Sequence, residues 1–471
     1  MPNILALAFA FICSILALPA TAQNQLVSDS LGFVVIDDIV LIGNRQTKSH
    51  IIKRELTLKE GDTLRLQKRD SVLARNQANI FNTNLFTIVE ILLSKTQGEL
   101  ATLKVVVQER WYLFPIPLFE LSDRNFNEWW TTYRRDLSRT NYGLRFRKDN
   151  FRGRRETLGF VTQFGFTQRF GIAYSNPYLT KNQRLGLNVS GGYGQNKAIA
   201  YTTENNKLLF VKNEQGNARE RWDINFSLQY RPAFYAFHSF EASYQNLWVT
   251  DTIIKLNPHY YTKDYNKLRH ASIGYAFRYD KRDAQAYALR GHVFKFSANY
   301  LGLLPNDNIK QFETTMAWGQ YIPLSKKWFW DYQFIGQLSY NPMPSFARTL
   351  AMGYGDHVMR GYELYVITTQ ASGIAKQTLK YQFLNTIKKW KFIPIEQFQK
   401  VPLAMYATMY IDTGYALDRY FSINNTLNNK FLYSMGVGFD IVTYYNSVVR
   451  FNYAVNRLGQ ARLYLNFTTD L

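Results

Sequence analysis

Apolar and polar side chains alternate along many short segments of the C-terminal two-thirds of the chain. Residues 448–456 place their apolar side chains on one face and mainly polar ones on the other: Val449, Phe451, Tyr453 and Val455 against Arg450, Asn452, Ala454 and Asn456. Residues 403–412 and 461–471 repeat the pattern. Alternation over about ten residues is typical of β-strands that cross a membrane with the apolar face toward lipid. A soluble β-sandwich would show the same period.

Counting these segments predicts sixteen strands, an even number that lets an antiparallel barrel close with both ends on one side of the membrane. The strands are expected at 141–149, 156–165, 168–176, 184–194, 197–211, 220–231, 238–250, 268–280, 291–302, 311–321, 328–341, 373–385, 403–414, 431–443, 446–456 and 461–470. Segment 197–211 has an alternative interpretation as a loop, because Asn205-Asn206 is a turn signal. The predicted fold class is mainly β, with a 16-stranded antiparallel transmembrane β-barrel over residues 140–471.

Residues 33–110 show a different organisation, in which helical and strand periods are mixed. The order is β-α-α-β-β, which predicts one small α+β domain before the barrel. Its expected elements are strand 33–42, helices 49–56 and 66–81, and strands 88–93 and 100–107.

The N-terminus has the features of an export signal. Residues 4–18 are apolar, and Ala20 and Ala22 form an A-x-A cleavage pattern before Gln23. We therefore expect a signal peptide at 1–22 and a short extension at 23–32; an uncleaved anchor helix is the alternative. Export, strand length and aromatic residues at strand ends, as at 328–330, together favour a membrane barrel over a sandwich.

Composition narrows the class of protein further. Of 471 residues, 46% are hydrophobic and 16% aromatic, which argues against disorder. Beyond the first two dozen residues no apolar run is long enough for a spanning helix. The only cysteine, Cys13, lies inside the expected signal, so disulfide scaffolds and thiol catalysis are excluded for the mature chain. The net charge of +21 predicts anionic partners: lipid headgroups, lipopolysaccharide or acidic polypeptide.

Residues 111–139 are expected to form a basic and aromatic junction between the two domains. Trp129 and Trp130 lie beside Arg134 and Arg135, and rings among cations suit a membrane interface. A solvated junction is the alternative, and nucleic-acid binding is not expected of an exported chain.

Catalytic patterns are missing from the sequence. The six histidines are scattered without an H-E-x-x-H pattern, and no G-x-S-x-G or phosphate loop is found. We therefore predict no enzyme activity, no metal site and no cofactor.

Several motifs together carry a family resemblance. Residues 33–44, 54–56, 61–62, 85–86 and 105–110 look like a POTRA domain, and further matching segments lie at 150–153, 174–178, 279–283 and 290–291. The sharpest match is Met359, Arg360, Gly361 and Tyr362 in the long connection 342–372, followed by Tyr-Ile-Asp-Thr-Gly at 410–414. In order and spacing these motifs resemble the BamA/TamA family of outer-membrane proteins (the bacterial surface antigen family).

The resemblance implies that the Arg-Gly-aromatic loop folds back into the barrel lumen, where Arg360 meets acidic side chains. Alternation supplies two candidates on polar strand faces, Asp412 and Asp440. A solvated loop arginine is the alternative. The sequence departs from the family pattern in having one POTRA domain, Asn84 at a common glycine position, Ala288 at a usual proline position and a final Leu471. These departures leave open a general assembly factor or a specialised relative.

The resemblance also implies a lateral gate between the first and last strands. Strand 141–149 carries Gly143 and Arg145 and is crowded with charges, whereas the last segment contributes Leu463, Phe467 and Leu471. A weakly paired strand could template an incoming one by β-augmentation; the alternative is that its charges lie at the rim or in the lumen. In the POTRA domain, segments 100–107 and 33–42 are the candidate edges for holding a substrate strand.

The leading hypothesis is a non-enzymatic outer-membrane assembly, insertion or translocation factor with its POTRA domain in the periplasm. Expected partners are outer-membrane lipids and lipopolysaccharide, unfolded outer-membrane or secreted polypeptides, and accessory lipoproteins, with no nucleic acid. A polypeptide or lipid transport pore and a passive porin-like barrel are the alternatives.

Overall fold

The computed structural model describes most of the chain. The described residues are 32–97, 99–122, 129, 134–180, 182, 184–262, 265–389, 399–443 and 447–466. Ala20 and Ala22 of the expected cleavage site, Trp130, and Phe467 and Leu471 of the expected last strand lie outside them. Among the described residues, no helix is both long and apolar enough to cross a bilayer.

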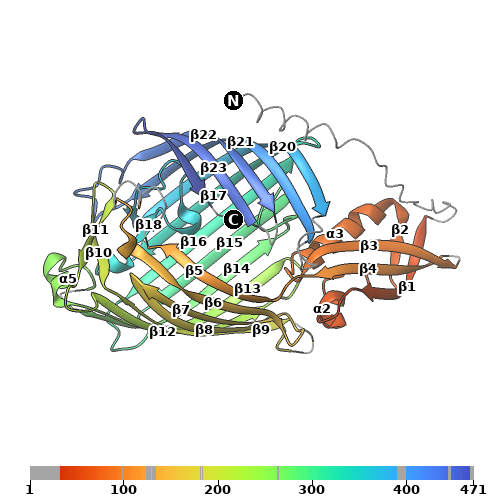
Figure 1. Cartoon of the computed structure of the whole chain (residues 1–471), viewed down its shortest axis with the longest axis horizontal. Coiled ribbons are helices and arrows are strands. Elements are labelled where there is room, and N and C mark those ends of the chain that lie inside the picture. The colour runs from red at the N-terminus through yellow and green to blue at the C-terminus, as the bar shows by residue number, and fades with distance from the viewer. Residues whose placement is uncertain are drawn as a thin grey trace, which may run out of the picture.

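The N-terminal domain is a four-stranded sheet covered by helices (Figure 1). Its elements are β1 (Phe33–Ile42), α2 (Ser49–Lys53), β2 (Thr63–Arg65), η1 (Leu66–Lys68), α3 (Arg69–Phe81), β3 (Phe86–Gln97) and β4 (Leu100–Glu109). Alternating apolar residues of β1 and β4 and one face of α3 form the core, in which Ile36, Ile80 and Leu103 are fully buried. The predicted small α+β domain is confirmed, with one short strand, β2, that the pattern did not predict.

The strand order of this sheet is β2-β1-β4-β3. Strand β4 pairs with β1 in parallel and with β3 antiparallel, so segment 100–107 is central and the prediction of an edge there is wrong. β1 pairs with β2 only over Phe33–Val35, and β3 is the long edge strand. The alternation of apolar and polar residues within each strand does not predict the order of the strands in the sheet. The parallel β1–β4 pairing depends on a crossover connection through the helices.

The C-terminal domain is a 16-stranded antiparallel β-barrel, as predicted (Figure 1). Its strands are β5 (Leu113–Leu121), β6 (Thr140–Phe151), β7 (Glu156–Gly165), β8 (Thr167–Asn176), β9 (Leu185–Asn196), β12 (Arg219–Tyr230), β13 (Ala236–Val249), β14 (Lys267–Asp280), β15 (Gly291–Leu301), β16 (Gln311–Pro323), β17 (Trp328–Tyr340), β20 (Ala371–Lys389), β21 (Lys400–Leu417), β22 (Phe431–Thr443), β23 (Ser447–Asn456) and β24 (Ala461–Asn466). Each pairs with the next in this order.

The strands turn their apolar faces outward and their polar faces inward. On β21, Met409 and Ile411 are 60% and 56% exposed, whereas Tyr410 and Asp412 between them are 3% and 0% exposed. An apolar exterior around a polar interior is the arrangement expected of a barrel in lipid.

Two strand assignments differ from the prediction, although the total of sixteen holds. The sheet begins at β5 rather than at 141–149, and segment 197–211 forms a separate hairpin of β10 (Ala198–Glu204) and β11 (Lys207–Lys212). The turn at Asn205-Asn206, the alternative interpretation of this segment, is the one observed. β5 was not predicted because Pro115 and Pro117 are unfavourable residues within a β-strand.

Proline in a sheet is confined to positions whose missing N–H is not needed by a neighbour. Among the described residues, β5 is the terminal strand and pairs with β6 alone, in a register that runs through both Pro115 and Pro117. The missing N–H groups therefore face away from β6, toward the free side of the sheet.

The predicted junction between the domains at residues 111–139 is not observed, because β5 belongs to the barrel and residues 122–139 connect β5 to β6. Immediately before β6, the Arg139 guanidinium stacks 4.8 Å from the Phe210 ring of β11, a strand at the barrel end away from the POTRA domain (Figure 1). The hairpin β10–β11 folds from there to the connection between β21 and β22, where Asn206 Nδ2 donates to Asn428 Oδ1 at 2.6 Å. The domains themselves are joined through residues 110–112.

Candidate functional site

The connection between β17 and β20 enters the barrel and contacts its inner wall. It contains the short hairpin β18 (Leu350–Met352) and β19 (Ile367–Thr369), and we call residues 353–366 between them the lumen loop. At its centre, Arg360 Nε donates to Asp412 Oδ2 at 2.9 Å and Nη2 donates to Oδ1 of the same carboxylate. This bidentate, charge-assisted pair fixes both the position and the orientation of the guanidinium.

Other groups complete the surroundings of Arg360. Its Nη1 donates to Thr378 Oγ1 at 3.1 Å, and its guanidinium carbon lies 3.9 Å above the centre of the Tyr410 ring. Its own backbone N–H also donates to Asp412, at 3.1 Å. The loop arginine predicted to meet an acid on the inner wall does so at Asp412.

Gly361 shows why this position of the loop requires glycine. Its φ is +85°, a left-handed conformation that is costly for residues with a side chain. An added Cβ would lie 3.2 Å from Ser434 Cβ and 3.3 Å from Ala454 Cβ. The loop backbone therefore approaches the barrel wall as closely as packing allows.

The lumen loop is bonded to each of the last three strands. Asn456 Nδ2 of β23 donates to the Gly361 carbonyl at 2.8 Å, and Tyr464 of β24 donates to the same oxygen at 3.3 Å. The Tyr362 hydroxyl donates to the Tyr433 carbonyl of β22 at 3.1 Å. Met359 and Tyr362 are buried in a small apolar cluster. The lumen loop thus links β22, β23 and β24, the last three strands of the sheet.

The structure differs from the prediction at Asp440. Its Oδ2 accepts a hydrogen bond from the Tyr287 hydroxyl at 2.8 Å, and Arg450 Nε lies 3.9 Å from the same oxygen, so it is not a second carboxylate for Arg360. Tyr287 belongs to the turn between β14 and β15, residues 281–290, which we call the inner turn. The inner turn reaches across the lumen to the C-terminal strands.

Lys380 of β20 forms a second contact with the inner turn. Its Nζ donates to the Ala288 carbonyl at 3.3 Å, lies 4.2 Å from the centre of the Tyr287 ring, and pairs with Asp331 of β17 at 3.0 Å. The residue pattern did not predict the contacts of Lys380 and Tyr287. The signal that could have revealed them is the apolar run Ala286-Tyr287-Ala288, which is unusual for a solvated turn.

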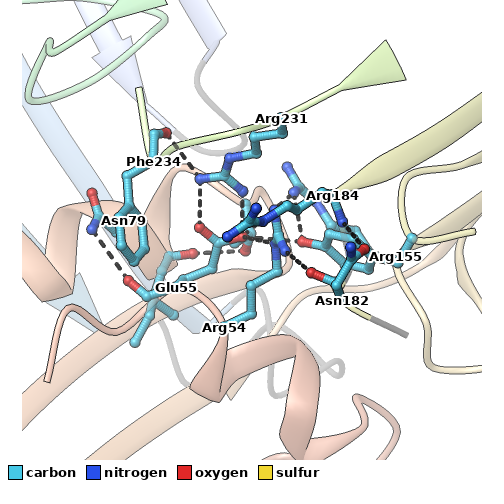
Figure 2. Close-up of polar contacts among 11 residues, drawn as sticks. Arg54, Glu55, Asn79, Arg155, Asn182, Arg184, Arg231 and Phe234 are labelled. Carbon is cyan, nitrogen blue, oxygen red and sulfur yellow. Dashed lines mark hydrogen bonds and ion pairs between the residues drawn. The ribbon is translucent and has the colours of Figure 1, made fainter. Parts of the chain in front are cut away.

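Glu55 joins the POTRA domain to the barrel (Figure 2). Both carboxylate oxygens accept hydrogen bonds from Arg231, at 2.8 and 2.9 Å, and one of them also accepts from the Tyr178 hydroxyl at 3.0 Å. Arg54 and Arg155 each lie 3.9 Å from the same carboxylate. Glu55 follows helix α2, whereas Arg231, Tyr178 and Arg155 belong to connections between barrel strands. This Glu55 cluster therefore fixes the domain orientation.

The pKa of Glu55 follows from this environment. Burial alone would raise the pKa, but the hydrogen bonds and charge of Arg231, helped by Arg155 and Arg54, outweigh burial and lower it below the usual 4.5. The carboxylate is therefore charged at neutral pH, and its stabilising contribution is lost only as pH falls through the lowered pKa.

We expect Glu55→Gln to release the POTRA domain from the barrel. The change leaves three arginines without their countercharge, and breaking a buried pair costs about 3–5 kcal/mol. Spin labels on the two domains, read by pulsed electron resonance, should show a broadened interdomain distance in the variant at pH 7. In the wild type the distance should still be narrow at pH 4.5 and broaden only as the pH falls through the lowered pKa of Glu55.

Glu60→Gln is the matched control. Glu60 pairs with Lys53 at 2.8 Å on the surface of the same domain, with about half of each side chain exposed, so its loss should change little. A narrow distance distribution in Glu55→Gln would contradict the role of the Glu55 cluster.

The expected gate residues do not lie together at the edge. The two end strands of the sheet are β5 and β24, and among the described residues no ladder joins them. Gly143 and Arg145 lie on β6, the second strand, because β5 precedes it; Arg145 lies 3.6 Å from Glu120 of β5. Leu463 is on β24, exposed on its outer face. The seam between the ends of the sheet is therefore formed from β5, not from 141–149.

Trp129 forms hydrogen bonds with two later residues of the connection between β5 and β6. Trp129 Nε1 donates to the Asp136 carbonyl at 2.9 Å, and the Arg135 N–H donates to the Trp129 carbonyl at 3.1 Å. Arg134 and Arg135 both have left-handed backbone angles, φ +49° and +65°. Among the described residues, no group of three or more His, Cys, Asp or Glu side chains is arranged to hold a metal ion.

Comparisons with known proteins agree with this architecture. A family model described as the Omp85 superfamily domain matches residues 150–467, and a POTRA model described as a surface antigen variable number repeat matches residues 34–110. A search of curated proteins found no significant match.

Two solved structures share the fold. BamA from Haemophilus ducreyi lacking POTRA domains 1-3 aligns with a TM-score of 0.50 and 15% identity, over 92% of this chain and 83% of that one. CdiB from Escherichia coli aligns with a TM-score of 0.51 and 12% identity, over 92% and 75%. The resemblance inferred from the motifs is thereby confirmed. The Omp85 family model matches well over half of the length of this chain, so this chain belongs to the Omp85 superfamily.

Proposed function

We propose that this protein inserts polypeptides into, or translocates them across, the bacterial outer membrane, with its POTRA domain in the periplasm. The observation that carries the proposal is the position of the POTRA edge strand. Thr83, Asn84 and Leu85 line a cavity of about 1040 Å³ that extends into the barrel, and β3 begins at the next residue. A polypeptide segment paired to β3 would therefore start at the barrel entrance.

The free edge of β3 supports the first step. An edge strand presents unpaired N–H and C=O groups, to which an unfolded β-segment can add as a further strand. Backbone hydrogen bonds do not depend on the side chains of the added strand, so substrates of many different sequences can pair with the edge of β3. The POTRA domain would act by binding and orienting, with no catalytic group and no cofactor.

The seam between β5 and β24 supports the second step. A strand in lipid needs every backbone group paired, so a seam can release its own pairs only by exchanging them with an incoming strand. The free side of β5 lacks two donors at Pro115 and Pro117 and is therefore easier to separate from a partner. The lumen loop would keep β22 to β24 in place while β5 moves.

The chemistry of the surface suggests the remaining partners. Trp129, Arg134 and Arg135 belong to the connection that follows β5, and β5 leads away from the POTRA domain. In this connection arginines can meet the phosphates of lipopolysaccharide and the indole ring can lie among headgroups. Accessory lipoproteins remain a proposal from the family resemblance alone.

A polypeptide or lipid transport pore is the second candidate, and the cavity in the barrel favours it. It predicts conductance in planar bilayers that rises when the lumen loop is deleted, with no effect on other barrels. A passive porin is not favoured, because the lumen loop and the inner turn both cross the bore.

Depletion of the protein in its own cells distinguishes these candidates. An insertion factor should lower the amounts of folded outer-membrane barrels in the membrane fraction and raise periplasmic unfolded forms, because its substrates then lack a route into lipid. Quantitative proteomics of membrane fractions measures both. Unchanged barrel levels, with a defect confined to one exported polypeptide or lipid, would reject insertion in favour of transport.

A further inference from the structure

Two adjoining cavities lie where the POTRA domain meets the barrel. The larger, of about 1040 Å³, extends along the inner wall, and the smaller, of about 110 Å³, lies between α3 and the inner turn. Because Arg155, Arg231 and Arg278 line both cavities, we treat them as one space and call it the vestibule.

The walls of the vestibule carry an excess of positive charge. Nine of the lining residues are Arg or Lys and five are Asp or Glu, an excess of four positive charges. Low-dielectric walls strengthen the potential inside such a space and concentrate counter-ions of the opposite sign. The vestibule is therefore suited to hold an anion.

The few acids in this region are already engaged. The single carboxylate of Glu55 serves Arg54, Arg155 and Arg231, as Figure 2 shows. Asp280 binds Arg282 through both oxygens, at 2.9 and 2.8 Å, and lies 3.9 Å from Arg278. Two carboxylates thus face five guanidinium groups, whose mutual repulsion is left partly uncompensated.

Two arginines in the vestibule are available to a ligand. Arg184 is exposed and, among the described residues, its guanidinium has no hydrogen-bond or ion-pair partner; Figure 2 shows it beside Arg155 and Arg54. The Arg278 side chain is 37% exposed, stacks 4.5 Å from the Phe237 ring and has a long contact of 3.9 Å with Asp280, so its N–H donors can bind further acceptors.

We propose that the vestibule binds carboxylate side chains of a polypeptide as it passes from the POTRA domain to the barrel, with Arg184 and Arg278 as its principal ligands. The proposal rests on the proposed function and specifies its substrate: segments that carry Asp or Glu. Each arginine would donate to a carboxylate, a pairing that is stronger than a neutral hydrogen bond.

The position of the vestibule favours a polypeptide over a lipid headgroup. Thr83, Asn84 and Leu85 line it and lead directly into β3, so a segment paired to this edge would project alternate side chains toward the arginines. The vestibule is on the inner wall of the barrel and under the POTRA domain, away from the apolar outer faces of the strands.

Fluorescence anisotropy on the purified full-length protein in nanodiscs tests the proposal. The probe is a short fluorescein-labelled peptide of alternating Glu and Ser, and the matched probe has Gln in place of Glu. The Glu peptide should bind, with an affinity that falls as salt rises, and the Gln peptide should not. Arg184→Gln and Arg278→Gln should each weaken binding about tenfold, whereas Arg269→Gln, an exposed arginine near the other end of β14, should not.

Equal binding of the two peptides, or unchanged affinity in both vestibule variants, would overturn the proposal. Dihexanoyl phosphatidylglycerol is the competitor: displacement of the probe by this lipid at lower concentration than by unlabelled Glu peptide would also overturn it, in favour of a lipid headgroup site. The assay needs no insertion activity. If depletion leaves barrel levels unchanged while the peptide still binds through Arg184 and Arg278, only the proposed function fails. If depletion lowers barrel levels but the peptide does not bind through these arginines, only the vestibule proposal fails.

Discussion

Replacing Arg360 by alanine should free the lumen loop while the barrel remains folded. The variant leaves Asp412, which is fully buried, without its guanidinium partner, and breaking such a pair costs about 3–5 kcal/mol. The loop has further bonds at Gly361 and Tyr362, so we expect loosening rather than expulsion. Protease cleavage between residues 353 and 366 should accelerate by about 100-fold or more, as measured by mass spectrometry, and insertion activity should fall.

The controls separate the loop from the barrel. Heat-modifiable migration on gels should be the same in Arg360→Ala and wild type, because every strand ladder is retained. Arg419→Ala removes an exposed arginine from the connection between β21 and β22 and should leave cleavage unchanged. If cleavage and activity of Arg360→Ala both match the wild type, the Arg360–Asp412 pair has no role in holding the loop.

Locking the seam should abolish insertion. Cysteines introduced at Phe119 of β5 and at Leu463 or Leu465 of β24, all exposed on the outer face, are the pairs to test for a disulfide that joins the two end strands. Because the only native cysteine, Cys13, lies in the expected signal peptide, we expect the mature protein to contain only the introduced pair. The oxidised protein should fail to insert a substrate barrel into proteoliposomes, and reductant should restore insertion, since an incoming strand must enter between the two end strands to pair with them.

A disulfide between neighbours that stay together provides the comparison. Tyr142 of β6 and Phe164 of β7 are register partners, so a cysteine pair there adds the same chemical bond without closing the seam. This variant should insert substrate in both redox states. Full activity of an oxidised β5–β24 pair would show that the seam need not open.

The sequence predicted most of the barrel because its signal is local. On β21 the alternation of Met409 and Ile411 with Tyr410 and Asp412 is visible in the residue order and is the same in the structure. β5 was missed because Pro115 and Pro117 break that local signal, although they are compatible with a terminal strand. That error displaced the expected seam by one strand and misplaced the connection 122–139.

Contacts between distant segments were predictable only where a motif marked them. The Met-Arg-Gly-Tyr run pointed to Arg360, and the polar face of β21 pointed to Asp412. No pattern relates Asp440 to Tyr287, which is 153 residues away. Segment 54–56 was matched to a POTRA domain, but the contact of Glu55 with the barrel was not predicted, because a glutamate at the end of a short helix is ordinarily solvated and its burial depends on how the domains dock.

The two prolines of β5 also bear on how copies of the protein behave beside one another. A strand margin rich in carbonyls but short of N–H groups accepts hydrogen bonds more readily than it returns them. If the β5 edges of two molecules faced each other, some carbonyl oxygens would remain without a hydrogen bond in the hydrocarbon layer. Two copies of the protein therefore gain little by joining their sheets through β5. For the same reason, a substrate strand paired with β5 would form an incomplete set of hydrogen bonds. This favours release of the substrate once its own first and last strands can pair.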